Sequence, residues 1–288
     1  MPNAYLIKRM MEGNSLMTND NYLAIGFRDV DRNSDLGKLV ACLEFLDGLP
    51  SFIAYKTRSI ERMQLKPGDT AVDLGCGLGF DVRKMAEIVR PGGRAIGVDL
   101  SNKLLEAGKR AFADHGEIEF ENCDIHRLPF DSNSIDSIRV DRTLQHVADP
   151  RKVISEMIRV LKPAGRLVCA EPDWFTFVID SDDIDMTTRV VERWRSSFKN
   201  PSIGRQLLGR IRKEGLKNAW AEEFVLLATG IEAVNIVYDI YETIRILEEE
   251  NKGDAPRLSS WLRALIKSDK DVPVTASVTL FLAGGQKP

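Results

Sequence analysis

The chain has 288 residues, of which 43% are hydrophobic, and its 40 basic and 43 acidic residues give a net charge of −3. This length and apolar content suit one large domain, or one domain with an added cap. The absence of a basic excess argues against a nucleic-acid substrate. No apolar run reaches the ~18 to 20 residues that a membrane helix needs, and the N-terminus lacks the apolar core of a signal peptide. The sequence therefore predicts a cytoplasmic protein without a membrane span.

The four cysteines are far apart and show no spacing typical of metal ligands, so no metal site is expected. They are Cys42, Cys76, Cys123 and Cys169.

The first 65 residues predict a helical extension ahead of the main domain. Residues 1–34 are polar and irregular, and apolar residues then follow helical spacing over 35–46 and 51–65.

A regular alternation of strands and helices follows the extension. Strands are expected at 70–74, 94–98, 117–121, 135–140 and 165–170. Helices are expected at 80–90, 102–114 and 151–161. Strands that alternate with helices imply a mostly parallel sheet covered on both faces.

The alternation breaks after Glu171. Residues 172–215 are rich in aromatic residues and arginines and predict two helices inserted above the sheet as a cap. The remaining expected elements are a strand at 217–228, a long helix at 230–250, a helix at 255–267 and a final strand at 274–283.

A glycine-rich turn gives the first indication of a ligand. The segment 71–79 reads as a buried strand that ends in Gly75, Gly77 and Gly79 and opens a helix, and the next strand ends in Asp99. Glycines let a ligand approach the backbone, and an acid at that strand end can hold two ribose hydroxyls. A dinucleotide fingerprint would place glycine at position 80, where this chain has Phe80. The pattern predicts a nucleoside site and favours S-adenosylmethionine over a dinucleotide.

Further motifs follow in order along the chain. They are Asp73 within the first strand, Cys123-Asp124-Ile125 after the third, Leu144-Gln145-His146-Val147 after the fourth, and the run from Arg159 to Leu167 before the fifth. This order resembles the class I S-adenosylmethionine-dependent methyltransferases, within the branch that includes the menaquinone and ubiquinone C-methyltransferases. The resemblance is close over about 65–170. It implies an α/β fold at 66–288, a Rossmann-like, doubly wound, seven-stranded, mostly parallel sheet with an antiparallel last strand.

Two segments resemble a subgroup that acts in microbial secondary metabolism. They are Arg139-Val140-Asp141-Arg142 and Gly204-Arg205-Gln206-Leu207-Leu208. Quinone enzymes usually carry a small polar residue in the first segment, so a quinone substrate is put in doubt. Some relatives methylate a carbon of a prenyl chain, and the teleocidin C-methyltransferase is one for comparison.

The resemblance implies S-adenosylmethionine as cofactor and assigns a set of residues to it. They are Asp73, Gly75, Cys76, Gly77, Gly79, Asp99, Leu100, Ser101, Asp124, Ile125, Asp141 and Arg142. Asp99 would accept both ribose hydroxyls, Leu100 would pack on the adenine ring, and Asp124 would accept from the adenine amino group. For any single acid, a solvated strand end or a helix cap is the alternative role.

Methyl transfer from a sulfonium mainly needs alignment, and it needs a base only if the acceptor loses a proton. His146 is the candidate base, and Glu171 and Asp173 follow the fifth strand on the same rim, where either would orient the imidazole. A packing or capping role in a short helix is the alternative for His146.

Aromatic residues predict an apolar acceptor pocket. Candidate substrate-binding residues are Trp174, Phe175 and Phe177 at the start of the cap, and Tyr22, Phe27 and Tyr55 in the N-terminal extension, with core packing as the alternative role. Methyltransferases of this type commonly fold an N-terminal segment over the cofactor, so residues 1–65 are expected to form a lid. An exposed apolar helix there would also join subunits of a homo-oligomer.

The expected function is methyl transfer to a lipophilic small molecule, a natural product of the prenylated, terpenoid or polyketide kind. Transfer to carbon or to oxygen stays open. The alternatives are a quinone or lipid methyltransferase of primary metabolism, a nicotinamide-dependent oxidoreductase, and a protein that keeps the cofactor for cyclisation or partner binding without methylating.

Overall fold

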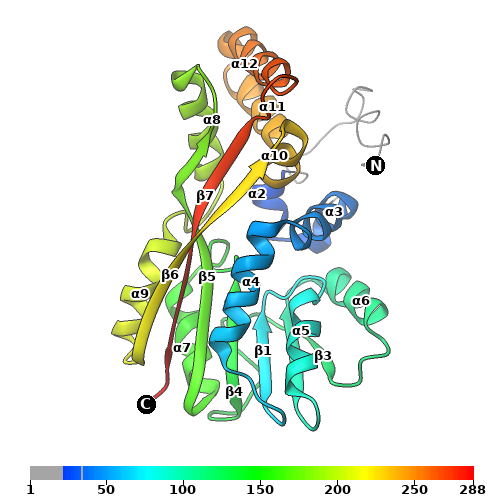
Figure 1. Cartoon of the computed structure of the whole chain (residues 1–288), viewed down its shortest axis with the longest axis vertical. Helices are drawn as coiled ribbons and strands as arrows, with labels where there is room; N and C mark the ends of the chain where they lie inside the picture. Colours follow the sequence, from blue (N-terminus) through cyan, green and yellow to red (C-terminus); the bar gives the residue numbers. More distant parts are fainter. Residues whose placement is uncertain (1–21, 34) are drawn as a thin grey trace.

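A computed structural model describes residues 22–33 and 35–288 of the chain (Figure 1). The strands are β1 (Thr70–Leu74), β2 (Arg94–Asp99), β3 (Ile118–Asn122), β4 (Ile135–Asp141), β5 (Leu161–Ile179), β6 (Lys217–Thr229) and β7 (Thr275–Gln286). They form one seven-stranded sheet in the order β3-β2-β1-β4-β5-β7-β6. Strands β1 to β5 are parallel, and β7 runs antiparallel to both β5 and β6. The predicted Rossmann-like sheet with an antiparallel last strand is confirmed.

Helices cover both faces of the sheet. Successive strand residues point to opposite faces, and because both faces are apolar, each needs a layer of helices. Ala71 and Ala95 face one core together with residues of α4 (Pro50–Met63) and α5 (Phe80–Val89). Val72 and Ile96 face the other core. That second core also contains residues of α7 (Pro150–Val160) and α9 (Ile203–Lys213). The strand order reverses between β1 and β4, so the carboxyl ends of these two strands mark the place where open α/β sheets bind ligands.

The remaining helices gather mainly around the far ends of β5, β6 and β7 (Figure 1). They are α2 (Leu23–Gly26), α8 (Ile184–Ser196), α10 (Ile231–Tyr238), α11 (Ile240–Glu250), η3 (Lys252–Asp254) and α12 (Ala255–Ser268). Beside the parallel strands lie η2 (Val30–Arg32), α3 (Leu36–Asp47) and α6 (Asn102–Ala111). In this described part of the chain, no helix combines the length and the apolar character that crossing a bilayer requires.

The start of the predicted cap differs from expectation. Two helices, α8 and α9, lie within 172–215 as predicted, but α9 covers a face of the sheet instead of joining a cap, and residues 172–179 continue β5. Pro172 pairs with Leu280 and Ile179 pairs with Ala276 of β7. The strand continues because β7 supplies an antiparallel partner, which the local sequence does not reveal.

The helix expected over 230–250 is broken at Asp239. This residue adopts a left-handed conformation with φ 48° and separates α10 from α11. Its buried carboxylate accepts hydrogen bonds from the Leu23 N–H and the Lys38 ammonium, at 2.9 and 2.8 Å. The break therefore ties the N-terminal segment to the helices above the sheet.

An aromatic cluster fills the space between these helices and β5. It consists of Tyr22, Trp174, Phe177, Trp194, Phe198 and Tyr238. Ring centroids within the cluster lie as close as 4.5 Å, between Trp174 and Phe198. Such contacts add stabilisation beyond the burial of apolar area.

Candidate active site

The glycine turn lies between β1 and α5 with its backbone in the left-handed region. Gly75, Gly77 and Gly79 have φ values of 71°, 56° and 82°. A Cβ at Gly75 would lie 2.1 Å from the Thr143 Oγ1, and one at Gly79 would lie 2.6 Å from the Phe120 ring. Both the conformation and the close approach therefore require glycine at these positions.

Asp99, at the end of β2, faces this turn. One carboxylate oxygen accepts the Gly77 N–H and the other accepts the Ser101 N–H, each at 2.9 Å. Burial raises the pKa of Asp99. Each oxygen keeps a lone pair for a further donor, and the two backbone bonds fix the direction of the carboxylate. Leu100, next in sequence, is 63% exposed beside it.

The N-terminal segment is attached at the same place. Asp31 in η2 accepts from the Ser101 hydroxyl at 2.6 Å and from the Asn102 N–H at 3.0 Å. Ser101 in turn caps α6 by accepting the Leu104 N–H. Sequence reasoning missed Asp31, because an isolated acid in an irregular polar segment carries no positional signal.

The turn after β3 holds Asp124 and Ile125. Asp124 Oδ1 lies 2.6 Å from His126 Nδ1, and its side chain is largely exposed. Ile125 is buried. Cys76 is half-buried in the glycine turn, with its Sγ 3.8 Å from the Gly77 carbonyl oxygen. These residues lie at the carboxyl ends of neighbouring strands, as expected.

A buried ionic cluster lies beneath the turn. Its members are Arg139, Asp73, Asp81, Asp141, Lys56 and Lys84. Arg139 is fully buried and lies 3.4, 3.2 and 2.8 Å from the carboxylates of Asp73, Asp81 and Asp141. Lys56 pairs with Asp81 at 2.6 Å.

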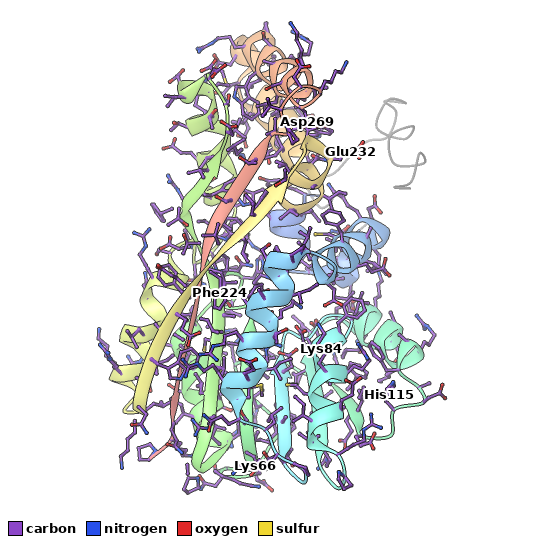
Figure 2. All side chains as sticks on the ribbon, in the orientation of Figure 1. Lys66, Lys84, His115, Phe224, Glu232 and Asp269 are labelled. Atoms are coloured by element: carbon purple, nitrogen blue, oxygen red, sulfur yellow. The ribbon has the colours of Figure 1, made fainter. Side chains whose placement is uncertain are left out.

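The cluster connects the N-terminal helices to the sheet. The Tyr55 hydroxyl of α4 donates to Asp141, at 3.2 Å from each carboxylate oxygen. Lys84 of α5, labelled in Figure 2, pairs with Asp81 and with Asp47 of α3. Arg139 was not predicted as a site residue, although a charged residue inside an otherwise apolar strand indicates a paired, buried charge.

Asp73 keeps one unsatisfied oxygen in this cluster. Its Oδ1 is buried and accepts no hydrogen bond from the described residues, although Arg139 Nε lies 3.4 Å away. Burial raises the pKa of Asp73 to about 7, against the opposing charge of Arg139. This oxygen therefore keeps hydrogen-bonding capacity that the described residues do not use.

The expected pairing of His146 with Glu171 or Asp173 does not form. Glu171 accepts the N–H groups of Thr143 and Leu144 at 2.8 and 2.6 Å instead. Asp173 is fully buried and pairs with Arg205. Both carboxylates are occupied because the loop after β4 turns its amides toward Glu171 and the first turn of α9 lies against residues 171–173 of β5.

His146 packs against the aromatic cluster, with its ring 5.5 Å from that of Phe198. Its Nδ1 is buried and has no hydrogen-bond partner among the described residues. Burial, followed by the charges of Arg28, Arg142 and Lys199, lowers the pKa of His146 to about 3. The imidazole is therefore neutral at pH 7.

The family follows from comparison with known proteins. A family model described as a methyltransferase domain matches residues 65–224. The chain belongs to the class I S-adenosylmethionine-dependent methyltransferases. This membership replaces the nicotinamide-dependent alternative, as the missing glycine at position 80 also indicates.

The similar proteins include an uncharacterized protein and a quinone methyltransferase. An uncharacterized 37.1 kDa protein in transposon Tn4556 of Streptomyces fradiae is 41% identical over 250 residues, which cover 85% of this chain and 71% of that protein. The demethylmenaquinone methyltransferase of Staphylococcus saprophyticus is 36% identical over 129 residues, which cover 44% of this chain and 55% of that enzyme. The similarity to this enzyme thus spans about half its length.

Solved structures show the same fold at low identity. The YcgJ protein of Bacillus subtilis has a TM-score of 0.58 and 18% identity, covering 81% of this chain and 97% of that one. A phosphoethanolamine N-methyltransferase of Haemonchus contortus was solved with S-adenosylhomocysteine. It has a TM-score of 0.57 and 20% identity, and the match covers 92% of this chain and 60% of that one.

The predicted substrate residues lie in different surroundings. Tyr22, Trp174 and Phe177 are buried, and their ring contacts are with other members of the aromatic cluster. Tyr55 is fully buried, with its ring 6.5 Å from that of Phe224 on β6 (Figure 2).

Two of these aromatic residues are less enclosed. Phe27 is half-buried against the main core. Phe175 is 51% exposed, with the guanidinium groups of Arg195 and Arg205 at 4.3 and 5.2 Å from its ring centroid.

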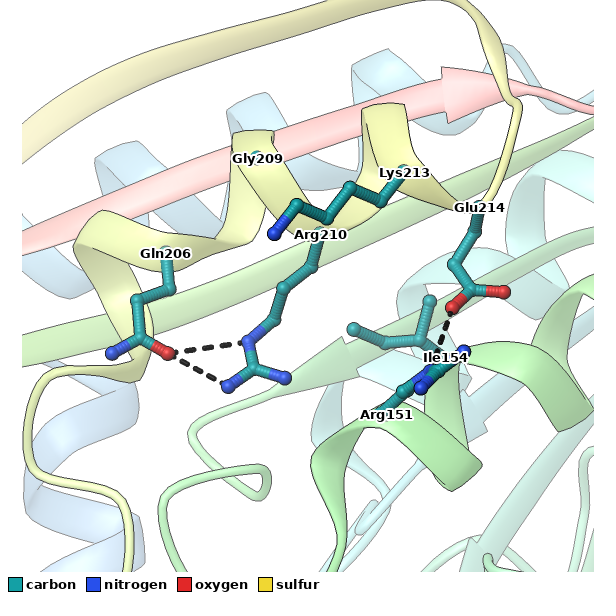
Figure 3. A pocket seen from close by; sticks show the side chains of 7 residues that line it. All are labelled: Arg151, Ile154, Gln206, Gly209, Arg210, Lys213 and Glu214. Carbon is teal, nitrogen blue, oxygen red and sulfur yellow. Dashed lines mark hydrogen bonds and ion pairs between the residues drawn. The ribbon is translucent and has the colours of Figure 1, made fainter.

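A separate hollow of about 570 Å³ lies between α7 and α9 (Figure 3). Its lining residues are Arg151, Ile154, Gln206, Gly209, Arg210, Lys213 and Glu214. None of the residues predicted for the cofactor or the acceptor lines it. Arg151 pairs with Glu214 at 3.5 Å, and Arg210 donates to Gln206, so local partners already occupy these charges.

Glu171 makes folding stability depend on pH. Burial raises the pKa of Glu171 to about 8, against about 4.3 in an unfolded chain. The folded state binds more protons between these values, so this stabilisation is complete below pH 4.3 and is lost as pH rises through 8. As the pH rises between these two values, we expect the free energy of unfolding of the wild type to fall relative to that of Glu171→Gln. The fall should be at most about 1.4 kcal/mol per pH unit.

Urea unfolding of both proteins at pH 5, 6, 7 and 8 measures this difference. Parallel curves for the wild type and Glu171→Gln would mean that Glu171 is ionised in the folded protein.

Proposed function

We propose that this methyltransferase transfers a methyl group to carbon or oxygen of a lipophilic natural product. The observation that carries this proposal is the aromatic cluster beside the loop after β4, where Phe198 packs on His146. The cluster makes this side of the loop apolar, which suits an apolar acceptor and helps to exclude water from the transfer. The predicted prenylated or terpenoid kind of acceptor belongs to this proposal.

The residues at the carboxyl ends of β1 and β2 fit S-adenosylmethionine. When bound, this cofactor supplies a methyl group on a sulfonium. The glycine turn would admit the methionyl part, Asp73 would bind its ammonium, and Asp99 would accept the ribose hydroxyls. The other residues assigned to the cofactor are Cys76, Leu100, Ser101, Asp124 and Ile125, and the backbone of Asp141 and Arg142.

The N-terminal helices serve as a lid in this proposal. Asp31 attaches the segment to the start of α6, and the Leu43 side chain of α3 lies 3.4 Å from the Cβ position of Gly77. Residues 1–21 of the predicted extension lie outside the described residues. A cytoplasmic location and a homo-oligomer formed through these helices stay predictions.

His146 acts on the acceptor as a neutral hydrogen-bonding group rather than as a general base. A base with a pKa of about 3 takes protons poorly at pH 7. We expect His146→Ala to raise the KM for the acceptor more than tenfold while kcat stays within threefold. A loss of kcat above 100-fold at unchanged KM, with a pH-dependent rate in the wild type, would assign the base role instead.

The test of function is methyl-labelled S-adenosylmethionine incubated with the protein and a cell extract of the source organism. Label in the organic phase supports a lipophilic acceptor, which mass spectrometry then identifies. Label in the protein or nucleic-acid fraction contradicts it.

Two alternatives give their own results. Quinone methylation of primary metabolism is favoured by the 36% identity to a demethylmenaquinone methyltransferase, and labelling of a demethylquinone extract would show it. Binding of the cofactor without transfer to any extract would indicate a non-methylating protein, used for cyclisation or partner binding.

A further inference from the structure

Four buried nitrogen atoms in or beside the aromatic cluster lack hydrogen-bond partners within residues 22–33 and 35–288. They are Arg28 Nε, Arg142 Nε, His146 Nδ1 and Trp194 Nε1. Buried polar atoms in folded proteins are nearly always paired. Unpaired nitrogens of this kind therefore indicate a ligand that completes them.

Arg28, Arg142 and His146 lie near one another. Arg142 and His146 lie four residues apart in the turn after β4, which the hydrogen bond from the His146 N–H to the Thr143 carbonyl closes. Arg28 follows α2, and both arginine charges act on the His146 ring.

The aromatic cluster lies beside His146. The Tyr22 ring at the start of α2 contacts Trp194 at 5.6 Å. Trp194 contacts Phe198 at 5.5 Å, and Phe198 contacts His146 at 5.5 Å. These successive ring contacts connect the N-terminal segment, which carries Tyr22 and Arg28, with the imidazole of His146.

The nearby carboxylates are already occupied. The carboxylate closest to Arg142 is that of Asp141, with Oδ1 at 3.8 Å from Nε, and the same group accepts from Arg139 and Tyr55. Glu171 binds the backbone amides after β4, and Asp239 binds Lys38. In the described part of the chain no carboxylate pairs with Arg28, so positive charge is in excess here.

We propose that Arg28, Arg142 and His146 form a binding site for an anionic group of the acceptor, a carboxylate or a phosphate. This proposal rests on the proposed function and adds a charged end to its lipophilic acceptor. A guanidinium recognises both anions through paired N–H donors, and a neutral imidazole donates one more hydrogen bond. The rings of Phe198 and of Phe52, 5.1 Å from the Arg142 guanidinium, border the site and suit the apolar part of the molecule.

The carboxylate of S-adenosylmethionine is the other source of such an anion. The Arg28 charge acts on the ring of His146, whereas near the cofactor residues Leu43 approaches Gly77 and Asp31 binds Ser101. This placement favours the acceptor as the source.

The test compares hexyl phosphate with hexan-1-ol as probes, titrated by calorimetry into protein saturated with S-adenosylhomocysteine. We expect the wild type to bind hexyl phosphate at least tenfold more tightly than the alcohol. In Arg28→Gln this preference should fall below threefold. Arg210→Gln, in the hollow between α7 and α9, is the matched control and should keep the wild-type preference.

Two results would overturn the proposal. One is equal affinity of the wild type for the two probes, which needs no variant and so does not depend on the folding of Arg28→Gln. The other is a tenfold loss of S-adenosylhomocysteine affinity in Arg28→Gln with unchanged affinity for 5′-methylthioadenosine, which would assign the arginines to the cofactor carboxylate. Binding of S-adenosylhomocysteine to the wild type tests the proposed function separately.

Discussion

Substitution of Gly75 by alanine is expected to weaken S-adenosylhomocysteine binding by at least 100-fold. The new Cβ would lie 2.1 Å from the Thr143 Oγ1, and the residue would have to keep a φ of 71°. The turn must then shift, and it displaces the Gly77 amide that orients Asp99. Because alignment within a cofactor site tolerates little movement, the loss should appear in both binding and turnover. Isothermal titration measures the affinity.

Gly68→Ala is the matched control for this substitution. Gly68 also has a positive φ, 91°, but nothing lies within 4 Å of its Cβ position. It should lose about 1–2 kcal/mol of folding stability from backbone strain and keep its ligand affinity. Wild-type affinity in Gly75→Ala would show that the turn does not contact the cofactor.

Replacing Arg139 by methionine is expected to reduce the free energy of unfolding by about 3–5 kcal/mol at pH 7. The arginine is fully buried among the carboxylates of Asp73, Asp81 and Asp141, and its removal leaves them with too little positive charge. The pKa of Asp73, which burial already raises to about 7, would rise further, and the lowered pKa of Asp81 would rise as well. Stability would then fall as pH rises, so the loss should be smaller at pH 5 than at pH 7. Urea unfolding at both pH values measures it.

Arg94→Met provides the control for charge removal in general. Arg94 pairs with Glu119 on the surface, where both side chains are about half exposed. Its loss should cost at most about 1 kcal/mol at either pH. A similarly small effect for Arg139→Met would mean that the buried carboxylates are protonated already.

Local patterns predict the parallel half of the fold well. Strands β1, β2 and β4 are each a short apolar run followed by a turn and an amphipathic helix, so sequence neighbours determine them. The glycine turn and Asp99 were predictable for the same reason, because their chemistry depends on position relative to these strands. The length of β5 was not predictable, since residues 172–179 are extended through pairing with β7, about 100 residues later.

The other features that the sequence did not predict also depend on contacts between residues far apart in the chain, and these residues are charged. Asp239 interrupts a good helical pattern because its carboxylate binds the Leu23 N–H more than 200 residues away. The predicted partner of His146 was wrong because rim position alone does not reveal that Glu171 satisfies backbone amides. Arg139 and Asp31 act through partners that no single segment of sequence contains.

The long strands β5 and β7 have a consequence for protein engineering. Residues Val178 and Ile179, beneath the helices that border the proposed acceptor site, pair with Ser277 and Ala276, and Ala228 of β6 pairs with Ala276 from the other side. A chimaera that exchanged only residues 172–215 with a relative would replace the end of β5. The ends of β6 and β7 would stay unchanged, and β7 would have to pair with a strand of another sequence. To transfer the proposed acceptor site between relatives, a chimaera should therefore exchange the ends of all three strands together with α8 and α10 to α12.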